Sequence, residues 1–151
     1  MANISDTHGT ISVKNVGKEF LEFLDKVQGQ ETDAYYKLVD HSNIDDAEVD
    51  KDNNLVMDFF SFGRWHYGAN LEGYLNGVWM QRDHSDDYDN FIEALIEKDG
   101  SVLVKYYDTE AGEGFTGQGE AVLQVVDKQA FFEDNFKEEE LTAQTLAEDR
   151  S

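Results

Sequence analysis

VMDFFSFGRWHYGANLEGYLNGVWM, residues 56–80, is the stretch on which the fold of this chain depends. It contains both tryptophans of the protein, Trp65 and Trp79, among a high density of phenylalanine and tyrosine. Aromatic side chains bury more surface per residue than any others, so a segment this rich in them is expected at the centre of the core.

The pattern inside this stretch changes from strand to helix. Apolar residues alternate with their neighbours over residues 55–62, which predicts a β-strand. Gly63 then permits a turn, and Leu71, Leu75 and Val78 recur at helical spacing. We therefore expect a helix from Leu71 onward, with Asn70 as its amino-terminal cap.

The same two periods predict the other elements. One domain, residues 1–136, is expected to hold them, followed by an acidic helical extension or loose tail over 137–151. The predicted elements are strands at 10–13, 34–40, 101–108 and 120–126, helices at 16–27, 85–96 and 128–136, and a polar loop or hairpin at 41–54.

This order predicts an α+β fold, with a mainly antiparallel sheet and helices packed on one of its faces. Its first elements approximate the βαββαβ arrangement, so we expect a ferredoxin-like fold with an added helix. The strand that ends in Phe62-Gly63-Arg64-Trp65 and leads into an aromatic helix resembles small ferredoxin-like proteins carried by phages and plasmids. That resemblance implies a fold and no catalytic residue.

The composition excludes several classes of protein. The chain has 40% hydrophobic residues, too many for a disordered protein. It has no cysteine, which excludes disulfides and thiolate catalysis and fits a reducing compartment. No segment approaches eighteen uncharged apolar residues, so we expect a soluble, cytoplasmic protein that does not bind membranes.

The charge is the outlier of the composition. Twelve basic and 33 acidic residues give a net charge of −21, well beyond the magnitude of roughly 2 to 8 typical of a soluble small domain. Such a chain should not bind nucleic acid directly, and a basic protein surface is its natural partner. A salt-adapted acidic surface is the structural alternative.

Two motifs resemble ligand sites, and both fail on inspection. Asp50, Asp52 and Asn54 match the first ligands of a calcium loop, but Leu55 and Ser61 stand where that loop needs glycine and glutamate. The glycines of residues 112–117 spell GxGxxG, but a strand rather than a helix follows them. The histidines lack metal-ligand spacing and no nucleophile motif is present, so we expect no cofactor, no metal and no catalytic residue.

The acidic surface itself remains as the functional signal. We expect a nucleic-acid mimic, whose carboxylates occupy the basic groove of a DNA- or RNA-binding protein. In size and charge the chain resembles acidic phage proteins directed against restriction or CRISPR systems. Exposed aromatics such as Tyr67 and Phe115 could anchor the contact. The residues expected to bind the partner are Asp45, Asp46, Glu48, Asp50, Asp52, Asp83, Asp86, Asp87, Asp89, Glu110 and Glu113.

Another function stays open. The alternative is a non-enzymatic, ferredoxin-like protein-interaction or assembly module of a phage or mobile element that is not a nucleic-acid mimic. Such a module could form a homodimer, and an apolar patch should then remain exposed.

Overall fold

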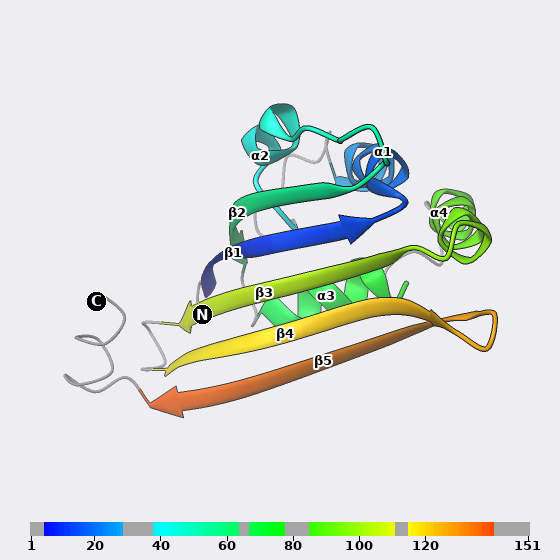
Figure 1. Cartoon of the computed structure of the whole chain (residues 1–151). Coiled ribbons are helices and arrows are strands. Elements are labelled where there is room, and N and C mark those ends of the chain that lie inside the picture. Colours follow the sequence, from blue (N-terminus) through cyan, green and yellow to red (C-terminus); the bar gives the residue numbers. More distant parts are fainter. Residues whose placement is uncertain (1–4, 29–37, 64–66, 78–84, 111–114, 141–151) are drawn as a thin grey trace.

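The structure is a computed structural model that describes residues 5–28, 38–63, 67–77, 85–110 and 115–140. Its elements follow one another in Figure 1 from blue to orange. They are β1 (Ser5–Lys14), α1 (Gly17–Gln28), α2 (His41–Asp46), β2 (Leu55–Gly63), α3 (Tyr67–Leu75), α4 (Ser85–Glu97), β3 (Ser101–Glu110), β4 (Phe115–Val126) and β5 (Gln129–Glu140).

The strands form one five-stranded sheet in the order β2-β1-β3-β4-β5, and all neighbours are antiparallel. The register is continuous, so Ile11 of β1 lies opposite Met57 of β2 and Val104 of β3. The α+β class and the antiparallel sheet expected from the sequence are thereby confirmed.

The two faces of the sheet have different environments. On one face, here the covered face, alternate residues such as Ile11, Phe59, Val104 and Leu123 are buried beneath the helices. Helices α1 and α4 pack together there through the stacked rings of Phe23 and Phe91, whose centroids lie 4.9 Å apart. The intervening residues point to the other side, the open face, where most are exposed.

The order of elements differs from the expected βαββαβ arrangement. Residues 38–40 form no strand, although Leu38 and Val39 are buried, and 34–37 lie outside the described residues. Helix α2 follows within the segment expected to be a loop, because the Asp40 carboxylate caps it by accepting a hydrogen bond from the Ser42 amide at 3.1 Å.

The helix expected at 128–136 is instead the edge strand β5. Asp127 and Lys128 both have positive φ, 51° and 63°, as a tight two-residue hairpin turn requires. The chain therefore reverses directly from β4, and Phe132 and Phe136 fall on the same face of β5 at period two. Residues 137–140 continue this strand rather than a tail, and 141–151 lie outside the described residues.

Helix α3 begins earlier than expected. It starts at Tyr67, so Asn70 lies inside the helix instead of capping it. Tyr67 is 1% exposed and stacks on Phe59 of β2 at 5.5 Å, so the expectation of an exposed anchor at Tyr67 is wrong. None of the helices in the described ranges has the length and apolarity that a membrane crossing needs.

Candidate functional site

The first acidic cluster lies on α2 and on the segment that joins it to β2. Asp45, Asp46, Glu48, Asp50 and Asp52 are all exposed. They are close in sequence, and side chains of the same segment hold it in place through hydrogen bonds within a turn and to α1.

A turn at residues 50–54 holds the cluster's carboxyl end. The Asp50 Oδ1 atom accepts hydrogen bonds from the backbone amides of Asp52 and Asn54, each at 2.9 Å. This carboxylate oxygen therefore closes the turn in which a calcium loop was considered. Within the described part of the chain, no three histidine or acidic side chains lie close enough to hold a metal ion.

Asn53 attaches this turn to the start of α1. Its backbone carbonyl accepts a hydrogen bond from Gly17 N at 2.8 Å, and its side-chain Oδ1 accepts one from Lys18 N at 2.8 Å. Its Nδ2 donates to the Glu19 carboxylate at 2.7 Å. These amides are the unpaired donors at the beginning of a helix, so Asn53 caps α1 from a distant part of the chain.

Glu19 in turn joins α1 to the end of α4. Lys98 Nζ lies 2.8 Å from the Glu19 carboxylate, and the Asn15 side chain donates to the Lys98 and Asp99 carbonyls at 3.1 and 3.2 Å. Burial alone would raise the pKa of Glu19, but the hydrogen bonds from Lys98 and Asn53 outweigh it and lower that pKa. The Glu19 hydrogen bond also raises the pKa of Lys98.

The second acidic cluster lies in the first turns of α4. Asp86 and Asp89 are exposed and Asp87 is half-buried. Asp86 and Asp87 occupy the first turn, as expected from the sequence, where negative charge interacts favourably with the helix dipole. Asp87 also lines a small pocket of about 100 Å³ between α4 and α1, beside Glu22 and Lys26.

The fold brings these two clusters to the same side of the molecule. Helix α1 contacts both α2 and α4, and Figure 1 shows the three helices around one margin of the sheet. We call the exposed carboxylates of this region the acidic helical side: Glu22, Asp25, Asp45, Asp46, Glu48, Asp50, Asp52, Asp86, Asp89, Glu93 and Glu97.

The remaining predicted residues do not join this group. Asp83 and Glu113 lie outside the described residues. Glu110 ends β3, whereas α4 leads into the beginning of that strand, so Glu110 is at the far end of the sheet (Figure 1). Phe115, expected as an anchor, begins β4 at the same far end, opposite Glu110.

Charge separates the acidic helical side from the open face. The eleven exposed carboxylates of the acidic helical side are accompanied by four exposed lysines, Lys18, Lys26, Lys51 and Lys98. The exposed charges described on the open face are nearly balanced: Asp6, Asp58, Glu120 and Glu133 against Lys14, Lys105 and Lys137. The excess negative charge is therefore distributed unevenly over the described surface.

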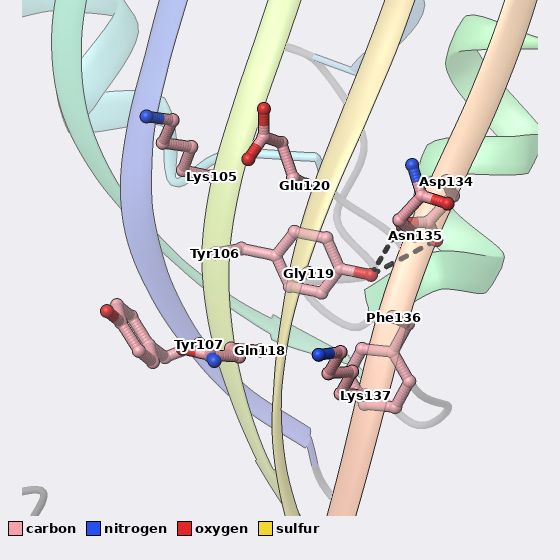
Figure 2. A pocket seen from close by; sticks show the side chains of 10 residues that line it. All are labelled: Lys105, Tyr106, Tyr107, Gln118, Gly119, Glu120, Asp134, Asn135, Phe136 and Lys137. Atoms are coloured by element: carbon pink, nitrogen blue, oxygen red, sulfur yellow. Dashed lines mark hydrogen bonds between the residues drawn. The ribbon is translucent and has the colours of Figure 1, made fainter.

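A pocket of about 610 Å³ lies across β3, β4 and β5, and residues of both faces of the sheet line it. Figure 2 shows the residues that line it, with Lys105 and Glu120 at one end and Tyr107, Gln118 and Lys137 at the other. The lining combines two lysines, two carboxylates, two amides, three aromatic rings and a glycine: Lys105, Lys137, Glu120, Asp134, Gln118, Asn135, Tyr106, Tyr107, Phe136 and Gly119. Sequence reasoning missed this pocket, because one of its three strands, β5, was expected to be a helix.

Two tyrosines pack against each other on the covered face of the sheet, and one of them, Tyr106, also lines this pocket. The ring of Tyr106 lies 5.0 Å from that of Tyr67, and its hydroxyl reaches Asp134. Burial raises the pKa of both phenols well above the usual value, and neighbouring carboxylates raise it further. Both groups therefore stay protonated at neutral pH and serve as hydrogen-bond donors.

A buried carboxylate connects the sheet with α3. Asp108 is 3% exposed, and its two oxygens accept hydrogen bonds from Thr7 Oγ1 at 2.9 Å and from the Tyr67 backbone amide at 2.8 Å. Because Tyr67 is the first residue of α3, Asp108 satisfies a donor at the helix start and fixes the helix against β3.

Comparison with known proteins gives no family for this chain. No protein-family model matches it, and neither the curated proteins nor the solved structures contain a significant match.

Proposed function

We propose that this protein is an acidic inhibitor that mimics nucleic acid and blocks the basic groove of a DNA- or RNA-binding protein, such as a restriction or CRISPR effector. The acidic helical side would make the contact, and the carboxylates would stand in for phosphates. A partner of this kind acts in the cytoplasm, where a chain without cysteine is at no disadvantage.

The uneven distribution of charge is the observation that supports this proposal. A uniformly acidic surface would serve solubility or salt adaptation, whereas here the carboxylates gather on α1, α2 and α4 and the open face is nearly balanced. Asn53, Asn15 and Glu19 hold the elements that carry those carboxylates together. A rigid array of like charge favours fast, oriented encounter with a surface of opposite charge.

Capture of partners from a nuclease-treated cell lysate tests the proposal. We expect a retained protein that binds DNA or RNA by itself and releases it when this chain is added. Binding should weaken by at least about tenfold between salt concentrations of about 0.05 and 0.5 M, because the contact is electrostatic. Binding that is insensitive to salt, or that leaves the nucleic acid in place, would contradict the mimic.

A matched pair of variants separates the site from the bulk charge. Asp86→Lys with Asp89→Lys reverses two charges on α4, and Asp6→Lys with Glu133→Lys makes the same change in net charge on the open face. We expect the first pair to lower affinity by about tenfold or more and the second by less than about threefold. Equal losses would mean that net charge alone drives the association.

A second function is favoured by a different observation. All five large hydrophobic side chains described as exposed lie on the open face: Val56 (73% exposed), Phe60 (41%), Tyr107 (48%), Val126 (46%) and Phe131 (49%). Exposed apolar groups gathered on one surface are typical of a protein-interaction module. This surface is distinct from the acidic helical side, so the two functions are compatible.

A further inference from the structure

The open face brings the exposed apolar side chains of four strands onto one surface. Val56 and Phe60 come from β2, Tyr107 from β3, Val126 from β4 and Phe131 from β5. The strand pairing places Phe60, His8 and Tyr107 in one row across the sheet, and the rings of His8 and Tyr107 stack at 5.4 Å. A charged row, formed by Asp58, Lys105 and Glu120, lies between the row of Val56 and the row of Phe60, so apolar and charged groups alternate along this face.

The charges on this face are mixed in sign and close together. Lys105 of β3 lies directly opposite Glu120 of β4, and Lys137 of β5 lies opposite Gln118. Asp58 on β2 accepts a hydrogen bond from Thr10 Oγ1 at 3.2 Å, in the row that continues to Lys105. A surface with both signs at short spacing can meet an identical surface so that opposite charges face each other.

We propose that two copies of this chain associate through their open faces, with Val56, Phe60, Tyr107 and Phe131 in the contact. Two-fold association of identical surfaces is the commonest form of oligomer.

The charge of the whole chain favours a second copy over other occupants. Stacked rings and lysines on a sheet would suit the bases and phosphates of nucleic acid. The net charge of −21, however, makes the chain repel nucleic acid. A strongly basic partner would meet Lys14, Lys105 and Lys137 here and would bind better at the acidic helical side. A second copy meets balanced charge on the open face and keeps both acidic helical sides away from each other.

Salt distinguishes this association from the proposed function. Two chains of charge −21 repel at long range, so screening should strengthen the pairing of open faces. Binding of a basic partner by the acidic helical side should instead weaken with salt. The inference deepens the second function proposed above for the open face and does not rest on the nucleic-acid mimic, so the dimer and the mimic can each fail without the other.

Sedimentation equilibrium of the full chain tests the inference. At about 0.5 M salt and micromolar concentration we expect a mass of twice the 17.2 kDa of the chain, with a larger monomer fraction at about 0.05 M. A wild type that stays monomeric at about 0.2 mM in high salt overturns the proposal. If the chain stays monomeric and binds a single-stranded oligonucleotide, the proposal is overturned, and nucleic acid replaces a second copy as the occupant of the open face.

Two double variants with equal added charge locate the contact. Val56→Lys with Phe131→Lys places two lysines on the open face, and Asn76→Lys with Asn90→Lys places them at exposed positions after α3 and on α4. The two double variants reduce the net negative charge by the same amount, so the long-range repulsion between two copies of the chain falls equally in both. We expect the first to raise the dissociation constant by about tenfold or more and the second to leave it within about twofold. Equal dimerisation of all three proteins overturns the proposal.

A measurement on the unmodified chain covers the case in which the lysine variants fail to fold. Dilution of the isotope-labelled wild type should shift the amide signals of the open-face residues of β2 and β3 and leave those of Asp45 and Asp46 unchanged. Shifts confined to the helices would overturn the assignment of the contact.

Discussion

The hydroxyl of Tyr106 donates to both carboxylate oxygens of Asp134, at 2.9 and 3.0 Å, and it reaches them by lying across Gly119. Tyr106 belongs to β3 and Asp134 to β5, so the bond spans the strand between them. A Cβ atom at position 119 would come within 2.3 Å of the Tyr106 ring, so only glycine leaves room for it. The edge strand is thereby attached to the centre of the sheet.

The first prediction concerns this hydrogen bond. Tyr106→Phe keeps the ring that packs against Tyr67 and Phe136 and removes the donor to a carboxylate. We expect the free energy of unfolding to fall by about 1.5–3 kcal/mol, measured by urea denaturation. Tyr107→Phe, next in sequence but on the open face, should change it by less than about 0.5 kcal/mol. Equal effects of the two substitutions would rule out a stabilising role for the Asp134 bond.

The second prediction follows from the raised pKa values of Tyr67 and Tyr106. Below pH of about 10 the phenols are protonated in both the folded and the unfolded chain, so their contribution to stability is fully present. Above it the unfolded chain loses these protons while the folded chain keeps them. The free energy of unfolding should therefore fall with pH by up to about 1.4 kcal/mol per pH unit for each tyrosine.

Urea denaturation between pH of about 8 and 11.5 measures this slope. The slope should be shallower in Tyr106→Phe and unchanged in Tyr107→Phe. A slope that is the same in wild type and Tyr106→Phe would show that Tyr106 titrates alike in the folded and unfolded chain.

Regular periodicity explains which elements could be predicted from the sequence. Strand β2 and helices α1 and α4 have a clean period of 2 or 3.6, and the structure has them close to the expected bounds. Strand β5 was missed because Phe132 and Phe136, four residues apart, fit one face of a helix as well as one face of a strand, and Phe131 beside them fits the helical stripe. The turn before it, Asp127-Lys128, lacks the Asn-Gly signature of a two-residue hairpin.

The candidate site was predictable only in its composition. The acidic clusters are visible in the sequence, but their placement on one side depends on pairs such as Asn53 with Glu19 and Asn15 with Lys98, which are 34 and 83 residues apart. Asparagine side chains that cap or bridge at such distances leave no local pattern. The open face was equally hidden, because its rows of side chains exist only once the strand register is known.

The third prediction concerns Asn53, which has a positive φ of 62° and caps α1. Asn53→Gly keeps the backbone conformation and loses the side-chain bonds to Lys18 and Glu19, so stability should fall by about 1–2 kcal/mol. Asn53→Ala should cost about 1 kcal/mol more, since it adds strain in the left-handed region. Urea denaturation gives both values, and NMR titration should show the pKa of Glu19 rising when the Asn53 bond is lost. Alanine tolerated better than glycine would contradict the assigned backbone conformation.

The last prediction concerns Asp108, the buried carboxylate that joins β3, β1 and the start of α3. Asp108→Ala removes the acceptor of the hydrogen bonds from the Thr7 hydroxyl and the Tyr67 amide, and losing a hydrogen bond to a charged group costs about 1.5–3 kcal/mol. We therefore expect a loss of about 2 kcal/mol or more on urea denaturation, and faster hydrogen exchange at the Tyr67 amide. Asp108→Asn keeps one acceptor oxygen and should lie between alanine and wild type. Lys105→Ala, exposed on the same strand, is the control, and a comparable loss there would show that the effect belongs to β3 in general and not to the link with α3.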